Sequence, residues 1–274
     1  MALFPGRKAI KNTRLLTAAI LLPILLGIIW FLPSFFFFLF VTVLILRVQY
    51  EFYLLFYDAA GKRQMGFGLL LGLCLTSVIY FQPAYAGASL VFLLMALLLY
   101  NLFTFKEIKK TFTDSAVLFL GIVYLPGFVS HLFLIRDLPA GRGLIILVLL
   151  MTWGGDAGAY YIGKSMGKHK LAPRVSPNKT VEGALGGLFT TFLGCVMAKF
   201  TFLTFLSWGD VIVLSSLLGV FGQLGDLTES MLKRSAGVKD SSHIIPAHGG
   251  LFDKLDSISF AAPLLYYYMT LIYT

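Results

Sequence analysis

Long apolar stretches are the feature that most constrains how this chain can fold. A helix needs roughly 20 apolar residues to cross the ~30 Å hydrocarbon layer of a bilayer. About nine such stretches occur, at residues 15–32, 35–56, 66–82, 88–105, 115–134, 144–162, 181–206, 211–230 and 257–273. Charged residues make up 13% of the chain, about half the share that is usual in a soluble domain. We therefore predict an all-α, polytopic integral membrane protein with about nine transmembrane helices.

Basic residues are concentrated in alternate connections between these stretches. They are Arg7, Lys8, Lys11, Arg14, Lys62, Arg63, Lys106, Lys109, Lys110, Lys164, Lys168, Lys170, Arg174, Lys179, Lys233, Arg234, Lys239 and Lys254. The opposite connections contain only Arg136 and Arg142. Because Lys and Arg stay preferentially in cytoplasmic loops, the pattern predicts a cytoplasmic N-terminus and a C-terminus outside. The net charge of +9 is split among membrane loops without a recognition module, so no nucleic-acid partner is predicted.

Polar residues are distributed unevenly between the two halves of the chain. Residues 1–143 have short connections and are predicted to be N-terminal scaffold helices. Residues 144–274 hold nearly all the polar patterning and are predicted to form a catalytic membrane region, with cytoplasmic loops at 163–180 and 231–256. In the scaffold, Arg47 and Glu51 lie four residues apart on one helix face, where they are expected to pair. The compact chain, without a long soluble tail, is expected in the inner (cell) membrane of a bacterium.

Residues 158–165 satisfy the P-loop pattern G-x-x-x-x-G-K-S. A working P-loop follows a strand of an α/β domain, and its backbone amides wrap the phosphates. Here the pattern continues an apolar span and contains two tyrosines and an isoleucine. We therefore predict a helix in this segment and reject the nucleotide-binding loop.

The connection that follows is strongly basic and is interrupted by Pro173 and Pro177, with a helix expected to restart near Thr180. Ser176, Asn178 and Lys179 present hydroxyl, amide and ammonium donors at that helix start. Such donors suit an anion, since a helix N-terminus also favours negative charge. Solvated charge on an inner loop is the alternative interpretation.

Two carboxylate pairs flank the second cytoplasmic loop. Asp226 and Glu229 are three residues apart on one face of the eighth span, and Asp253 and Asp256 have the same spacing at the mouth of the ninth. Carboxylate oxygens hold Mg²⁺, which keeps several waters and bridges substrate phosphates. Spacing alone also allows the carboxylates to pair only with the nearby basic residues Lys233 and Arg234.

Residues 230–256 resemble the signature of the phosphatidate cytidylyltransferase (CDP-diacylglycerol synthase) family. The positions in register are Ser230, Lys233, Arg234, Lys239, Asp240, Ser242, Pro246, His248, Gly249, Gly250, Asp253 and Asp256. Lys254 stands where the family usually has arginine, so the charge is kept but a two-pronged phosphate contact is not. The stretches 156–183 and 225–230 are also similar to the family, and the length and span pattern extend the resemblance to the whole chain.

The resemblance implies a Mg²⁺-dependent, in-line transfer of CMP from CTP to phosphatidic acid at the cytoplasmic membrane face, giving CDP-diacylglycerol and pyrophosphate. It also implies a homodimer with a second cation beside Mg²⁺. By position, Asp226 and Asp253 are expected as leading metal ligands, with Glu229 and Asp256 supporting them. The expected catalytic residues are Asp226 and Asp253 together with Lys233 and Arg234. The expected substrate-binding residues are Ser176, Asn178, Lys179, Ser230, Lys239, Asp240, His248, Gly249, Gly250 and Lys254.

Two other functions stay open at this point. A CTP-dependent polyprenol or phytol kinase would use a similar metal–nucleotide site but transfer the γ-phosphate. A cation-coupled transporter would use Asp226 to bind the coupling ion, although transporters commonly show paired repeats that are not visible here. The H-G-G-x2-D-x2-D block favours the cytidylyltransferase.

Overall fold

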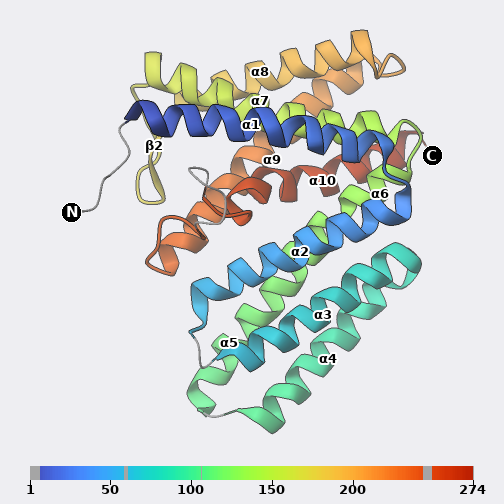
Figure 1. The fold of residues 1–274 in the computed structure, drawn as a ribbon, viewed down its shortest axis with the longest axis vertical. Coiled ribbons are helices and arrows are strands. Elements are labelled where there is room, and N and C mark those ends of the chain that lie inside the picture. The colour runs from blue at the N-terminus through green and yellow to red at the C-terminus, as the bar shows by residue number, and fades with distance from the viewer. Residues whose placement is uncertain (1–6, 59–60, 106, 243–248, 274) are drawn as a thin grey trace.

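The structure is a computed structural model that describes residues 7–58, 61–105, 107–242 and 249–273, with side chains from residue 19 onward. The long elements of these ranges are helices, accompanied by one two-stranded hairpin (Figure 1). The elements are α1 (Arg7–Phe31), α2 (Ser34–Phe56), α3 (Lys62–Phe81), η2 (Pro83–Tyr85), α4 (Ala86–Thr104), α5 (Ile108–Ile122), η3 (Val123–Gly127), α6 (His131–Asp137), α7 (Gly141–Met166), β1 (Lys170–Ala172), β2 (Ser176–Thr180), α8 (Val181–Thr201), α9 (Trp208–Ser235) and α10 (Phe252–Tyr273).

Each of the nine predicted spans overlaps a helix, and the all-α polytopic class is confirmed. By length and composition, seven described segments qualify as membrane spans: Ser34–Phe56, Lys62–Phe81, Pro83–Thr104, Ile108–Asp137, Gly141–Met166, Val181–Thr201 and Trp208–Ser235. The other two predicted spans fall on α1, whose apolar described part is Ala19–Phe31, and on α10, which has three charged residues in its first two turns. The orientation of the two termini stays a prediction.

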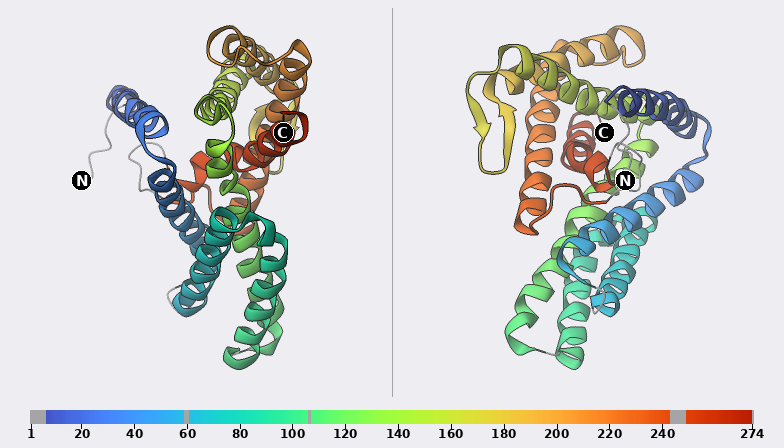
Figure 2. Two further views of the ribbon diagram at one scale, coloured as in Figure 1. Left: turned by 90° about the vertical axis from the view of Figure 1, so that its right-hand side faces the viewer. Right: turned by 60° about the vertical axis from the view of Figure 1, so that its left-hand side comes forward.

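The helices form two groups that meet at α6. Helices α2 to α5 pack together in one group and α7 to α10 in the other, while α1 contacts α7 (Figures 1 and 2). The predicted span 115–134 is one helical run from α5 to α6, interrupted by the π-helical turn η3 around Pro126. Proline cannot donate the usual helical hydrogen bond, which accounts for the wider turn there. Helix α6 then packs against α2, α7 and α10 and joins the groups.

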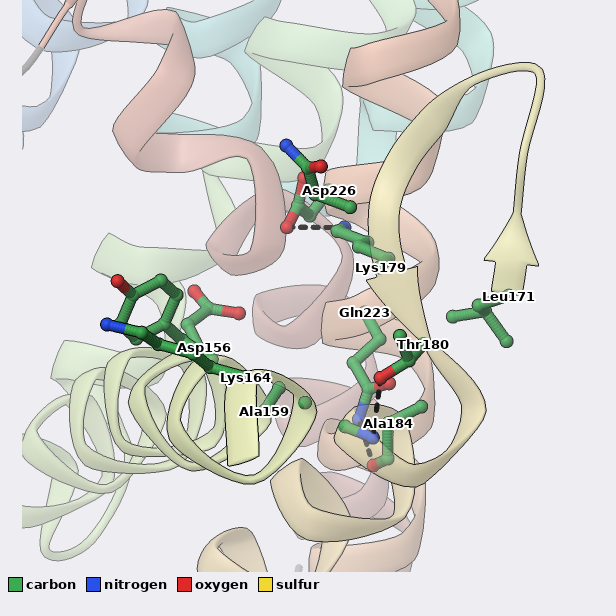
Figure 3. Close-up of a pocket in the computed structure, with 13 residues that line it drawn as sticks. Asp156, Ala159, Lys164, Leu171, Lys179, Thr180, Ala184, Gln223 and Asp226 are labelled. Atoms are coloured by element: carbon green, nitrogen blue, oxygen red, sulfur yellow. Dashed lines mark hydrogen bonds and ion pairs between the residues drawn. The ribbon is translucent and has the colours of Figure 1, made fainter. Parts of the chain in front are cut away.

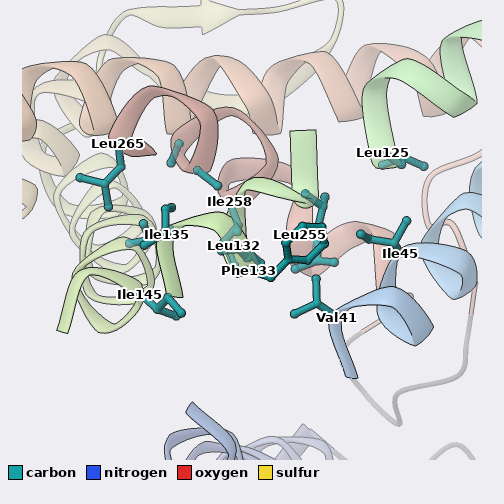
Figure 4. Packing of buried hydrophobic residues seen from close by; sticks show 14 of the residues in the cluster. Val41, Ile45, Leu125, Leu132, Phe133, Ile135, Ile145, Leu255, Ile258 and Leu265 are labelled. Atoms are coloured by element: carbon teal, nitrogen blue, oxygen red, sulfur yellow. The ribbon is translucent and has the colours of Figure 1, made fainter. Parts of the chain in front are cut away.

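The hydrophobic core continues across this junction. Val41 and Ile45 of α2, Phe133 of α6, and Ile258 and Leu265 of α10 are all buried in one cluster (Figure 4). Since side chains buried in one cluster restrict the motion of the elements that carry them, this packing fixes α10 relative to α2. The predicted division at residues 143 and 144 therefore separates regions that share a core, and it stays a prediction.

The loop predicted at 163–180 is more ordered than the sequence indicates. Helix α7 continues to Met166, and β1 then pairs with β2 in an antiparallel hairpin in which Lys170 lies opposite Thr180. Its turn is closed by a hydrogen bond of 3.2 Å from Val175 N to Ala172 O, with Pro173 at the second turn position. Proline is favoured there because its fixed φ matches the turn.

The restart of the helix near Thr180 is confirmed. Thr180 caps α8, and its Oγ1 accepts a hydrogen bond of 3.1 Å from Gly183 N. The Glu182 carboxylate accepts a hydrogen bond of 2.9 Å from Lys168 N and pairs with His169 Nδ1 at 2.6 Å. Together these contacts attach the base of the hairpin to the first turn of α8.

The predicted orientation can be tested by thiol labelling. In a chain with Cys74 and Cys195 replaced by alanine, we expect Thr204→Cys, an exposed position between α8 and α9, to react with a membrane-impermeant maleimide in intact cells. Lys168→Cys, an exposed position beside the hairpin, should react only after permeabilisation, because alternate loops lie on opposite sides. The reverse labelling pattern would overturn the orientation.

Candidate active site

Three carboxylates from two helices converge on one point. Asp226 and Glu229 of α9 and Asp256 of α10 each offer an oxygen, and these atoms all lie within 4.8 Å of one another. Glu229 is buried, and Asp226 and Asp256 are half-buried. We call these three residues the carboxylate cluster. The face of α9 that carries Asp226 and Glu229 is thus turned toward α10.

The close approach of α9 and α10 at the cluster depends on Gly225. A Cβ atom at this position would lie 2.5 Å from the backbone oxygen of Asp256 and 3.2 Å from the ring of Phe260. Any larger residue would have to push α10 away from α9. The glycine beside Asp226 therefore sets the separation between the two helices that carry the cluster.

Lys233 joins the cluster to Asp253. Its Nζ lies 2.7 Å from Glu229 Oε1 and 2.7 Å from Asp253 Oδ1. Asp253 also accepts a hydrogen bond of 2.9 Å from Gly250 N, at the start of α10. The structure therefore places Asp253 beside the cluster, in contact with a lysine and a backbone amide, while Asp256 lies within it.

A second lysine reaches the cluster from the hairpin. Lys179 Nζ of β2 lies 2.6 Å from Asp226 Oδ2, and the Ser230 hydroxyl is 3.5 Å from Asp226 Oδ1. The two predicted site regions, around 176–180 and 226–256, are thus brought together in space.

A cavity of about 490 Å³ opens next to Asp226, between α7, α8, α9 and the hairpin (Figure 3). Asp226 and Lys179 line it on one side, and Asp156 and Lys164 of α7 extend from the other. Asn178 of β2 is also among the lining residues. Its volume lies within the range of about 300–1,000 Å³ that is usual for small-molecule sites. Charged groups of both signs line a space large enough for a nucleotide.

The other predicted site residues have different surroundings. The guanidinium of Arg234 donates hydrogen bonds to the backbone oxygens of Val238, at 3.0 Å, and Val175, at 3.3 Å, so it connects α9 to the hairpin. Lys239 and Asp240 are exposed, Ser176 and Lys254 are half-buried, Gly249 has a positive φ of 86°, and Gly250 is buried. His248 lies outside the described residues.

The segment that matches the P-loop pattern, residues 158–165, lies inside α7, as predicted. Its backbone amides are therefore engaged in a helix and cannot wrap phosphates. Lys164 nevertheless faces the cavity, and its Nζ lies 5.9 Å from the centre of the Tyr160 ring.

Sequence reasoning missed two acidic residues. Asp156 lines the cavity, and an ionisable residue within the apolar stretch 144–162 was a sufficient signal to suspect it. Glu51 was expected to pair with Arg47, and this pair is confirmed at 3.1 Å. Glu51 also contacts the segment that begins α10. The sequence does not predict this contact, because nothing in it relates positions 51 and 252.

The carboxylate cluster fits a hard divalent cation. It supplies three oxygen donors from side chains within 4.8 Å of one another, with two lysines in contact at its edges. Mg²⁺ prefers oxygen ligands and commonly uses one or two carboxylates plus substrate phosphates. The cluster contains neither histidine nor cysteine, which are the ligands typical of zinc.

The sequence is similar to that of known cytidylyltransferases along most of its length. The sequence model of the cytidylyltransferase family matches residues 12–272. The chain is 38% identical to the phosphatidate cytidylyltransferase of Pseudomonas aeruginosa over 265 residues, 92% of this chain and 94% of that protein. It is 39% identical to the phosphatidate cytidylyltransferase of Bacillus subtilis over 186 residues, 67% of this chain and 66% of that protein.

The cluster makes a prediction about cation binding. Asp226→Asn and Asp256→Asn should each weaken Mn²⁺ binding, measured by electron paramagnetic resonance. The expected loss of affinity is ~10–100-fold or more, because mutation of residues that only support metal ligands already costs this much. Asp253→Asn should weaken it less, because Asp253 lies beside the cluster. Glu107→Gln, a charge loss at a side chain that is 62% exposed on the scaffold, is the control and should bind Mn²⁺ normally. Equal binding by all four variants would remove the metal assignment.

Proposed function

The chain belongs to the cytidylyltransferase family, and on this basis we propose that it is a phosphatidate cytidylyltransferase that converts CTP and phosphatidic acid into CDP-diacylglycerol and pyrophosphate. The observation that carries the proposal is the position of Asp226. It belongs to the carboxylate cluster and also lines the cavity, so a phosphate bound in the cavity would lie beside the place where a cation fits.

The cavity is the proposed site for CTP. Lys179 and Lys164 are cations in its wall, and Asn178 adds an amide that donates and accepts hydrogen bonds. The triphosphate would lie toward Asp226 and Lys179, whose ion pair of 2.6 Å would have to open or be shared as the phosphate enters. A charged group released from such a pair is available to neutralise the incoming phosphate.

In the proposed reaction, an oxygen of the phosphatidate phosphate forms a bond to the α-phosphorus of CTP. The bond from that phosphorus to the oxygen bridging to the β-phosphate breaks, and the electron pair leaves with pyrophosphate. A phosphate monoester is already an anion at pH 7, so no strong general base is needed. Catalysis of phosphoryl transfer rests mainly on positioning and charge neutralisation.

The protein side chains have separate tasks in this scheme. Lys179 is placed to neutralise phosphate charge at the cavity, while Lys233 holds Glu229 and Asp253 in position from within the helix pair. Asp226, Glu229 and Asp256 would hold Mg²⁺, which when bound would stabilise the charge that develops on the leaving pyrophosphate. The resemblance also implies a second cation, and we propose its site near the same carboxylates.

Localisation and assembly complete the proposal. The relatives are bacterial and the basic loops flank the site, so we place the enzyme in the inner membrane with its active site facing the cytoplasm. By the same family resemblance we propose a homodimer.

The product of the reaction provides the test. Purified protein is incubated with Mg²⁺, phosphatidic acid and CTP labelled at either the α- or the γ-phosphate. We expect the α-label to enter the lipid and the γ-label to be released as pyrophosphate. Asp226→Asn should lower the transfer by at least about 100-fold, since a ligand of the proposed cation is lost, and Glu107→Gln should leave it unchanged.

Two results would contradict the proposal. In a parallel incubation with a polyprenol in place of phosphatidic acid, transfer of the γ-label to this lipid alcohol would indicate a kinase. Failure of folded wild-type protein to transfer either label to lipid would remove the cytidylyltransferase assignment.

A further inference from the structure

Glu51 lies on α2, about 200 positions before α10 in the sequence, yet it contacts the segment in which α10 begins. Its side chain is fully buried, with 0% exposure. A carboxylate removed from water is costly unless ion pairs and hydrogen bonds compensate for the lost solvation. The partners of Glu51 therefore indicate what this residue does.

Four donors surround the two carboxylate oxygens. Oε2 accepts hydrogen bonds from Phe252 N at 2.9 Å and from the Ser241 hydroxyl at 3.2 Å. Oε1 accepts one from the Ser242 hydroxyl at 2.9 Å and pairs with Arg47 Nη2 at 3.1 Å. One donor belongs to α2 itself, and the other three belong to the loop after α9 and to the start of α10.

The bond from Phe252 gives Glu51 the role of a helix cap. Phe252 is the first residue of α10, and the first amides of a helix have no partner within the helix. A carboxylate is favoured at this end because it also interacts with the helix dipole. Such caps usually come from the residue just before the helix, whereas here a distant helix supplies one.

Gly250 allows the loop to close around Glu51. A Cβ atom at position 250 would lie 2.5 Å from Glu51 Oε2 and still closer to the Ser241 hydroxyl oxygen. The second glycine of the signature is thus needed because the buried carboxylate occupies the space that a side chain would take. The burial of the Glu51 carboxylate against position 250 therefore accounts for the glycine at this point of the signature.

We propose that Glu51 is a positioning residue for the transfer reaction, which holds the first turn of α10 so that Asp256 stays within reach of Asp226 and Glu229. Asp256 follows Phe252 by four residues, about 6 Å along the helix, so a shift of the capped end moves Asp256 as well. A displacement of ~1 Å at a reacting site can cost about 100-fold in rate. The inference rests on the proposed function for its kinetic readout only.

Glu51→Gln is the test variant, because it keeps the size of the side chain and removes its charge. Gln49→Met is the matched control. Gln49 is also on α2 and fully buried, but it donates to Tyr53 and Gly68, both within the scaffold. Both variants should lower thermal stability, so stability alone does not decide.

Three measurements separate the variants. In Glu51→Gln we expect amides at 250–256 to exchange hydrogen at least about tenfold faster, as a hydrogen bond to a charged group is lost. Mn²⁺ should bind more weakly, and kcat should fall by about 10- to 100-fold with little change in KM for CTP. Gln49→Met should match the wild type in exchange at 250–256 and in Mn²⁺ affinity.

The outcomes are distinguishable. Wild-type exchange at 250–256 and wild-type Mn²⁺ affinity in Glu51→Gln would overturn the inference, as would equal effects of Gln49→Met on both readouts. If Glu51→Gln does not fold, Ser242→Ala removes one of the loop hydrogen bonds and should give smaller changes in the same direction. If the wild type lacks cytidylyl transfer, the proposed function fails, and exchange and Mn²⁺ binding still decide the role of Glu51.

Discussion

The close contact between α9 and α10 is the constraint on which the site depends. It brings oxygens of Asp226, Glu229 and Asp256 within 4.8 Å of one another, an arrangement that like charges resist. Repulsion of this kind is stronger in surroundings of low dielectric constant than in water. The packing of the two helices, with Gly225 in their interface, must therefore be held by the rest of the molecule.

Lysines compensate part of this charge, and each also connects elements. Lys179 attaches the hairpin to α9 through Asp226, and Lys233 attaches α9 to α10 through Asp253. Two lysines thus contact three of four neighbouring carboxylates, and the negative charge that is left suits a divalent cation. Substrate phosphates would reorganise these ion pairs, since a phosphate oxygen competes for the same ammonium groups.

The sequence predicts the helical class, the hairpin-side cations and the two acidic pairs because each depends on local composition or spacing. Spacing alone does not distinguish Asp253 from Asp256, since both lie in the first two turns of one helix; the resemblance put Asp253 first, whereas the carboxylate cluster contains Asp256. Which of them faces α9 is set by the rotation of α10, and this follows from core contacts of residues such as Ile258 and Leu265. The hairpin was missed because its two prolines and its charges are equally typical of an irregular loop. Asp156 reaches the cavity, and Glu51 reaches Ser242 and Phe252, only through tertiary packing.

The length of α9 determines how deep in the membrane the cluster lies. The helix has 28 residues and spans about 42 Å, which exceeds the ~30 Å hydrocarbon layer. If Trp208 lies at one interface, as is usual for tryptophan, Asp226 lies about 27 Å along the axis and Lys233 about 38 Å. The cluster then lies close to the opposite boundary of the hydrocarbon layer, with the lysine beyond it. A lipid phosphate remains at that boundary and a nucleotide can approach it from water, so this is the depth at which the two can react.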